Sequence, residues 1–157
     1  MKIVVTADSH GDVGNLLKIC EENADMEALV FLGDGETDIE DIQNAYPTLR
    51  VYAVSGNCDH RGYYPDESLA VFGGKLVFYT HGSTYGVKRG LDEIKYRARQ
   101  AGAEVLLFGH THTAVCEKED DLLVLNPGTV GSMSALRHSY GVLNINGDKV
   151  TGEIINF

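Results

Sequence analysis

The chain has 157 residues, enough for one domain with a sizeable core, and its 43% hydrophobic and 23% charged content is ordinary for a globular protein. The formal net charge of −10 repels polyanions, which argues against a long nucleic acid as a partner. The three cysteines are scattered and odd in number, so we expect free thiols and a reducing, cytoplasmic location. No apolar run is long enough for a signal peptide or a membrane span, and we expect neither.

The first third of the chain alternates between strand and helix signals. Apolar residues at helical spacing predict a helix that starts at Asp12, and a second helix is expected at Ile39–Ala45, before Pro47. This alternation indicates parallel strands joined by crossover helices. The expected strands are Lys2–Ala7, Ala28–Leu32 and Arg50–Val54.

The rest of the chain is richer in strand signals. A hairpin is expected around Gly73-Gly74, because glycine accepts positive φ, and a helix is expected at Leu91–Ala101. Asn146-Gly147 is the turn signal between the last two strands. No repeat or linker is evident, so we expect a single domain over residues 1–157. The expected strands are Leu69–Phe72, Leu76–Tyr79, Val105–Phe108, Ala114–Glu117, Leu122–Leu125, Tyr140–Ile145 and Val150–Ile155.

Polar side chains of the kinds that bind metals follow several of these strands. In open α/β sheets the carboxyl ends of the strands converge on one crevice, so such side chains can meet in space. On an extended strand end, residues two apart point to the same side, which predicts that Asp8 and His10 reach one ion. The segments are Asp8-Ser9-His10, Gly33-Asp34, Gly56-Asn57, His81-Gly82 and Gly109-His110-Thr111-His112.

Together these segments supply seven nitrogen and oxygen ligands without a thiolate. Seven is too many for one tetrahedral zinc ion, and the set suits two hard or borderline divalent ions that share a carboxylate. Each segment alone is also typical of an ordinary turn, but their common position at strand ends favours metal binding. Two adjacent metal ions are a device for phosphoryl chemistry. The candidate ligands are Asp8, His10, Asp34, Asn57, His81, His110 and His112.

The order D-x-H, G-D, G-N-x-D, H-G and G-H-x-H resembles that of the calcineurin-like metallophosphoesterases. Cys58 and Asp59 complete the third motif, and Asn126-Pro127-Gly128-Thr129 resembles a loop of the small phosphodiesterase branch. The resemblance spans about residues 1–145. It implies an α/β fold, a four-layered αββα sandwich of two mixed β-sheets, with the metal ions at one edge.

The resemblance also implies how the ligands are divided. It assigns one ion to Asp8, His10 and His112, and the second to Asn57, His81 and His110. Asp34 would bridge the two ions through its two oxygens. The metals it implies are two divalent ions, with manganese expected and nickel, iron, cobalt or zinc as alternatives. A water between such ions loses a proton near neutral pH and can attack phosphorus, so Ser9 and Thr111 are expected to be structural.

The third motif departs from the wider family. Cys58 stands where a histidine is usual, and Thr37 stands where an aspartate would orient that histidine, so the protonation of the leaving group is left open. Cys58 could act as an acid, but a small buried apolar side chain is the favoured interpretation. Asp59 is expected to hold the loop or a ligand histidine by a hydrogen bond. The candidate catalytic residues are Asn57, Asp59 and Cys58.

The sequence and the resemblance together predict a metal-dependent phosphodiesterase acting on a small phosphodiester. A phosphomonoesterase of the same family and a non-catalytic protein-binding scaffold, as in a retromer subunit that resembles this fold, are the alternatives. Lys88 and Arg137 are candidate substrate contacts. A solvated loop is the competing explanation for Lys88, whereas the resemblance favours a place for Arg137 along the site. The resemblance also allows a homodimer, and no membrane partner is expected.

Overall fold

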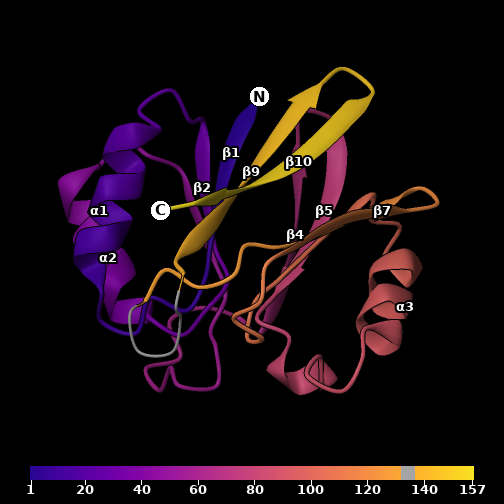
Figure 1. Ribbon diagram of the computed structural model, residues 1–157, viewed down its shortest axis with the longest axis horizontal. Helices are drawn as coiled ribbons and strands as arrows, with labels where there is room; N and C mark the ends of the chain where they lie inside the picture. Colours follow the sequence, from indigo (N-terminus) through magenta and orange to yellow (C-terminus); the bar gives the residue numbers. More distant parts are fainter. Residues whose placement is uncertain (132–136) are drawn as a thin grey trace.

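Two mixed five-stranded sheets pack face to face in the computed structural model, which describes residues 1–131 and 137–157 (Figure 1). The first sheet has the strand order β10-β9-β1-β2-β3 and the second β4-β5-β6-β8-β7. The strands of the first sheet are β1 (Lys2–Thr6), β2 (Ala28–Phe31), β3 (Val51–Ala53), β9 (Ser139–Asn146) and β10 (Lys149–Asn156). Those of the second are β4 (Glu67–Phe72), β5 (Lys75–Thr80), β6 (Val105–Phe108), β7 (Val115–Glu119) and β8 (Leu122–Asn126).

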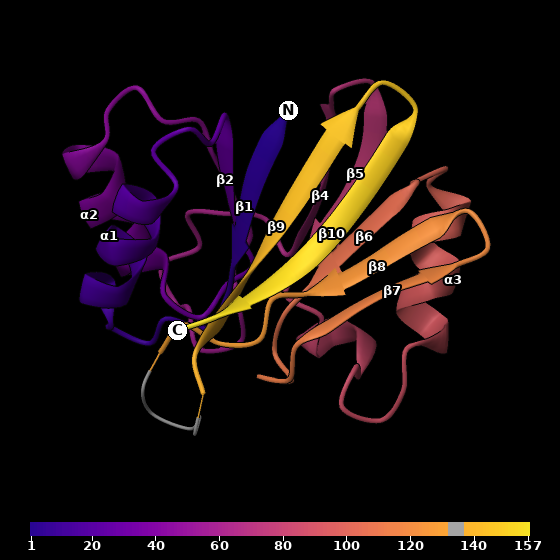
Figure 2. The ribbon, with the colours of Figure 1, turned by 45° about the horizontal axis from the view of Figure 1, so that its top comes forward.

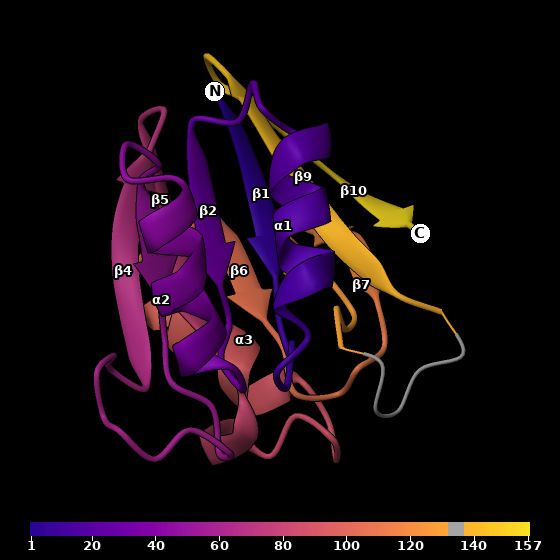
Figure 3. The ribbon, with the colours of Figure 1, turned by 90° about the vertical axis from the view of Figure 1, so that its left-hand side faces the viewer.

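Helices cover the outer face of each sheet and complete the four layers. Helices α1 (Val13–Glu22) and α2 (Glu36–Ala45) lie over β1 and β2 (Figure 3), whereas α3 (Asp92–Gln100) lies over the second sheet (Figure 2). A short 3₁₀ helix, η1 (Ser83–Tyr85), precedes α3. This arrangement confirms the expected αββα sandwich. No helix in the described ranges is both long and apolar enough to span a membrane.

The apolar runs of the sequence become strands that are buried on both faces. In β1, Ile3 and Val5 pack into the core between the two sheets, while Val4 packs under α1 and α2. In β6, Leu107 faces the core between the sheets and Leu106 faces α3. Continuous hydrophobic runs are typical of strands covered on both sides, which explains why no polar alternation marks them.

Parallel pairing brings the candidate ligand loops to one edge of the sandwich. β1, β2 and β3 run parallel, and so do β5, β6 and β8, so each set ends at the same edge of its sheet. The loops are bonded to one another there: Asp8 N–H donates to Gly33 O at 2.9 Å, and Gly109 N–H donates to His81 O at 3.0 Å. The convergence expected from the strand order is therefore confirmed.

Most element boundaries differ from the sequence expectation by one or two residues, and two of the differences have a clear physical reason. Helix α2 begins at Glu36 rather than Ile39, because acidic residues favour the first turn of a helix. The final hairpin turns through Gly147-Asp148 rather than Asn146-Gly147, because Asn146 already pairs with Lys149 and Gly147 takes the positive φ of +58° that starts the loop. Gly73 and Gly74, both at positive φ, form the earlier turn as expected.

Candidate metal centre

Most of the candidate ligands lie on backbone in the left-handed region. Their φ angles are +56° at Asp8, +47° at His10, +60° at Asp34, +66° at His110 and +57° at His112. Non-glycine residues rarely adopt this region, although aspartate and histidine are enriched there. We expected Asp8 and His10 to point to the same side because they would continue the extended strand β1. This reason is wrong, since the chain turns sharply at both residues.

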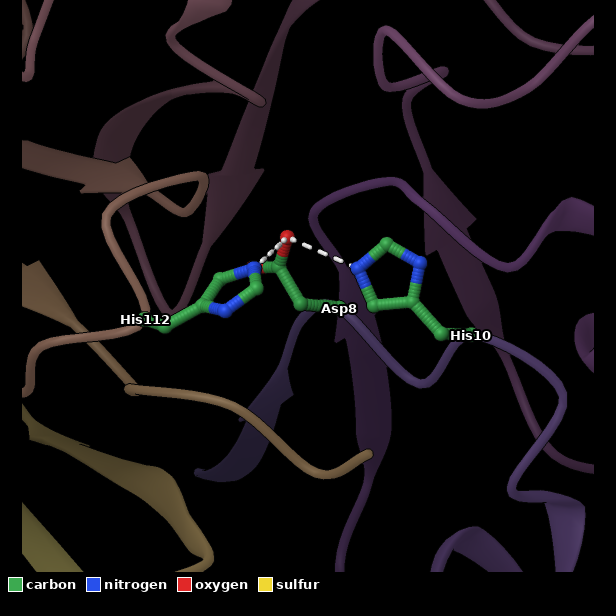
Figure 4. Close-up of side chains that lie close together, drawn as sticks. All are labelled: Asp8, His10 and His112. Atoms are coloured by element: carbon green, nitrogen blue, oxygen red, sulfur yellow. Dashed lines mark hydrogen bonds and ion pairs between the residues drawn. The ribbon is translucent and has the colours of Figure 1, made fainter. Parts of the chain in front are cut away.

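A first group of candidate ligands surrounds the buried carboxylate of Asp8. Nε2 of His112 lies 3.1 Å from Asp8 Oδ1, and Nε2 of His10 lies 3.9 Å from the same oxygen. Figure 4 shows the carboxylate between the two imidazole rings. The three ligand atoms lie within 4.8 Å of one another, close enough for one ion. The hydrogen bond to Asp8 raises the pKa of His112, although burial opposes it.

A second group forms around His81, which is almost wholly buried. Nδ1 of His81 lies 2.6 Å from the carbonyl oxygen of Leu32 and donates to it, so Nε2 carries a lone pair. That Nε2 lies 3.0 Å from Asn57 Oδ1, 3.1 Å from Nδ1 of His110 and 3.5 Å from Asp34 Oδ2. Two oxygens and two ring nitrogens therefore converge on one point, and these are ligand atoms that divalent metal ions accept, so this set fits a metal ion.

Asp34 lies between the two groups. Its Oδ2 is 3.8 Å from Nε2 of His10 and 3.5 Å from Nε2 of His81. Its Oδ1 instead accepts the backbone N–H of Cys58 at 2.8 Å. We expected Asp34 to bridge the two ions through its two oxygens. Instead Oδ2 faces both groups, because the loop after β3 occupies Oδ1.

The carboxylate of Asp59 holds two of the ligand loops. It accepts backbone N–H groups from Asp34, Gly35 and Gly56 at 2.8 Å each, and from Glu36 at 3.0 Å. Burial raises the pKa of Asp59, but the four hydrogen bonds outweigh it and hold the pKa below its usual value. Asp59 was expected to hold either the loop or a ligand histidine. Its hydrogen bonds show that it holds the loops.

Cys58 is exposed, which contradicts the interpretation that it is a small buried side chain. It follows Asn57, also exposed, in the loop after β3, and the amide of Asn57 donates to its sulfur at 3.4 Å. Partial desolvation and the carboxylate of Asp34 raise the pKa of the thiol. The apolar character of cysteine was a misleading signal here, because the exposure of this side chain depends on how the loop after β3 folds and not on its hydropathy.

The two candidate substrate contacts lie in different surroundings. Lys88 is exposed, and its positive charge acts on both His110 and His112. It contributes to the lowered pKa of His110, after burial and His81, and it partly opposes the raised pKa of His112. Arg137 is exposed at the start of the segment 137–157 and makes no hydrogen bond or ion pair with the candidate ligands within the described ranges. Lys88 is therefore the better placed of the two.

Sequence reasoning missed Asp38 and the role of Asn126, which hold two ligand loops in place. Asp38 Oδ2 accepts the Ser9 hydroxyl at 2.5 Å and the Gly11 N–H at 2.9 Å. Asn126 Nδ2 donates to Gly109 O at 2.9 Å and to the Thr111 hydroxyl at 3.0 Å. Asp38 comes four residues after Asp34, but that spacing does not reveal a contact with the loop after β1.

Gly56 offers a direct test of how tightly Asp34 is held. A Cβ at position 56 would lie 2.1 Å from Asp34 Oδ1 and 2.5 Å from the Asp34 backbone nitrogen. We expect Gly56→Ala to displace Asp34 and to destabilise the protein by about 1–3 kcal/mol. Gly14→Ala is the matched control, because its Cβ meets nothing nearer than 3.9 Å within α1 and should be neutral or stabilising. Urea unfolding and manganese titration of both variants measure the difference; equal behaviour would show that the Asp34 loop is not tightly packed.

Comparison with known proteins places the chain in a family. The model of the calcineurin-like phosphoesterase superfamily domain matches residues 1–148. The chain belongs to the calcineurin-like phosphoesterase superfamily. The family is hydrolytic, so the two groups of candidate ligands lie in a phosphoesterase.

Relatives and solved structures agree with this assignment. The probable metallophosphoesterase YsnB of Bacillus subtilis is 34% identical over 96% of this chain and 88% of its own length. The phosphodiesterase YfcE of Escherichia coli is 28% identical over 92% of this chain and 88% of its own length. Wild-type Vps29 of Entamoeba histolytica, solved in complex with zinc, has a TM-score of 0.77 at 18% identity and covers 99% of both chains, which shows a common fold.

Proposed function

We propose that this phosphoesterase is a phosphodiesterase that uses two divalent metal ions to hydrolyse a small phosphodiester. The observation that carries the proposal is the single oxygen of Asp34 that faces both groups of ligands, His10 on one side and His81 on the other. When bound, such ions supply an activated water and neutralise charge on the phosphoryl group. Manganese is the expected ion, with nickel, iron, cobalt or zinc as alternatives.

The residues of the chain determine how the substrate meets this centre. The proton on Nδ1 of His81 is fixed by Leu32, so Nε2 stays available as a ligand without a change of tautomer. Lys88 adds one positive charge beside His110 and His112, which would attract a phosphate oxygen. Because the ions would supply an activated water, no serine or threonine is needed as a nucleophile. The Ser9 hydroxyl, which donates to Asp38, and the Thr111 hydroxyl, which accepts from Asn126, instead join the loops.

A diester is favoured over a monoester by charge and by the third motif. The net charge of −10 repels a dianionic monoester more than a monoanionic diester. The position that carries a histidine in the wider family is the exposed Cys58, whose pKa is raised, so no imidazole is available there to protonate a poor leaving group. The name phosphodiesterase carried by the relative YfcE agrees with this preference.

The test compares one aryl phosphodiester with its monoester. With manganese or nickel supplied, we expect bis(p-nitrophenyl) phosphate to be hydrolysed with a higher kcat/KM than p-nitrophenyl phosphate, by roughly tenfold or more. The protein stripped with a chelator is the control and should hydrolyse neither. Faster turnover of the monoester would reverse the proposal in favour of a phosphomonoesterase.

The likeness to Vps29 favours one alternative, a non-catalytic scaffold with this fold. The retention of all seven candidate ligands argues against it, because a scaffold has no need of a second group built around His81 and Asn57. Metal analysis of the purified protein together with an assay of hydrolysis distinguishes the two. About two equivalents of metal together with hydrolysis supports the enzyme, and full metal occupancy without hydrolysis of any phosphoester supports the scaffold.

A further inference from the structure

A cavity lined by several polar side chains opens directly beside the second group of ligands. Its volume is about 150 Å³, and its lining residues include Asn57, His81, Ser55, Asp66, Thr80 and Ser83. This volume lies below the roughly 300–1,000 Å³ of pockets that hold whole small molecules. No aromatic ring other than the imidazole of His81 lines the cavity, so it offers no large surface on which a nucleobase could stack. Its size and position fit the alcohol part of a small phosphodiester.

The hydrogen bonds of the lining residues determine which alcohol the cavity can accept. The hydroxyl of Thr80 already donates to the backbone oxygen of Asp66 at 2.8 Å, and the hydroxyl of Ser55 donates to Tyr64 O at 2.9 Å. With their protons committed, both oxygens can only accept further hydrogen bonds. The exposed carboxylate of Asp66 is also an acceptor and has no partner among the described residues. Ser83 and Thr84 also line the cavity, and their hydroxyls can donate or accept. Because Ser55, Thr80 and Asp66 can only accept, the cavity as a whole favours a ligand that brings donors.

We infer that the cavity binds the alcohol part of the substrate and selects a short alcohol that bears a hydrogen-bond donor, either a hydroxyl or an ammonium group. The inference rests on the proposed function, which places the phosphoryl group at the neighbouring ligands Asn57 and His81. An apolar alcohol of the same length would leave the lining oxygens of Ser55 and Thr80 without partners once water is displaced. Asp66 is a specificity-determining residue in this arrangement, because its charge favours ammonium over hydroxyl.

The first experiment uses three phosphodiesters that share a p-nitrophenyl group and differ only in the second alcohol. These are the propyl, 3-hydroxypropyl and 3-aminopropyl esters, assayed with the manganese-loaded protein. We expect kcat/KM for the hydroxyl and amino esters to exceed that for the propyl ester by about tenfold. The comparison of the two donor-bearing esters distinguishes a hydroxylated substrate from a cationic one. Equal turnover of all three would overturn the inference.

Matched variants test whether Asp66 is responsible for the preference for the donor-bearing esters. We expect Asp66→Asn to reduce the advantage of the amino ester over the propyl ester by about tenfold and to reduce that of the hydroxyl ester less. Asp121→Asn removes an exposed carboxylate that lines a different cavity, near Asp148, and should change none of the three. An equal loss for all three esters in Asp66→Asn would contradict a role in specificity.

A binding measurement separates failure of this inference from failure of the proposed function. Propyl, 3-hydroxypropyl and 3-aminopropyl phosphate are titrated calorimetrically into the manganese-loaded protein and into Asp66→Asn. If no diester is hydrolysed, the proposed function is wrong, yet about tenfold tighter binding of the donor-bearing monoesters would still support the cavity as their site. Equal affinity for the three monoesters would refute the cavity's selection of a donor-bearing alcohol, whether or not hydrolysis occurs.

Discussion

Replacing Asp34 by asparagine is expected to abolish nearly all metal-dependent hydrolysis. The substitution keeps the shape of the side chain but removes the negative charge that faces both His10 and His81 through Oδ2. The loss of an outer partner of a metal ligand already costs roughly 10–100-fold, so removal of a shared ligand should cost at least about 100-fold in kcat/KM. The metal content of the purified variant, measured by mass spectrometry, should fall below that of the wild type.

Asp41→Asn is the matched control for this prediction. Asp41 is an exposed aspartate on α2, seven residues after Asp34, and it makes no contact with the candidate ligands in the described ranges. It should retain wild-type activity and metal content. Undiminished activity of Asp34→Asn would show that the assignment of the centre is wrong, because no other carboxylate of residues 1–131 and 137–157 belongs both to a group with His10 and to a group with His81.

The second large effect is expected from Asp59→Ala, and it should appear as a loss of stability before any effect on metal. The variant leaves four backbone N–H groups without their acceptor, including those of Asp34 and Gly56. Since Asp59 is half-buried, water can replace only part of what is lost, and we expect the free energy of unfolding to fall by about 3 kcal/mol. Urea unfolding in the presence of a chelator measures this free energy without a contribution from metal binding.

Two further variants make the Asp59 prediction specific. Asp59→Asn keeps one acceptor oxygen and should lose less than Asp59→Ala. Asp121→Ala, at an exposed position in the β7–β8 turn, should change the free energy of unfolding by less than about 0.5 kcal/mol. If Asp59→Ala is no less stable than Asp121→Ala, the loop hydrogen bonds do not contribute to folding.

The sequence predicted the buried strands and their common edge from local patterns, whereas the four layers were implied by the resemblance. Apolar runs such as those around Val5 and Leu107 fit strands buried on both faces, and polar residues directly after such strands meet at one edge. The resemblance supplied the division of the ligands, and the geometry groups Asp8 with His112 and His81 with His110 in the same way.

Features that depend on contacts between distant loops could not be predicted. The Ser9–Asp38 hydrogen bond joins residues 29 positions apart, and no spacing rule links them. The left-handed backbone at Asp8 has no signal in the local sequence. The choice of Oδ2 on Asp34 is set by the loop after β3, because the N–H of Cys58 occupies Oδ1. The prediction that Cys58 is buried was wrong for the same reason, since its exposure depends on how the loop after β3 folds.

The centre draws its members from both halves of the sandwich. Loops that follow β1, β2 and β3 carry both aspartates, His10 and Asn57, whereas loops that follow β5 and β6 carry His81, His110 and His112. Sliding of one sheet across the other would therefore change the distances from the two aspartates to the three histidines of the second sheet. It follows that bound cations would fasten the two halves together, and that their removal should speed amide hydrogen exchange along the interface between the sheets as well as in the loops.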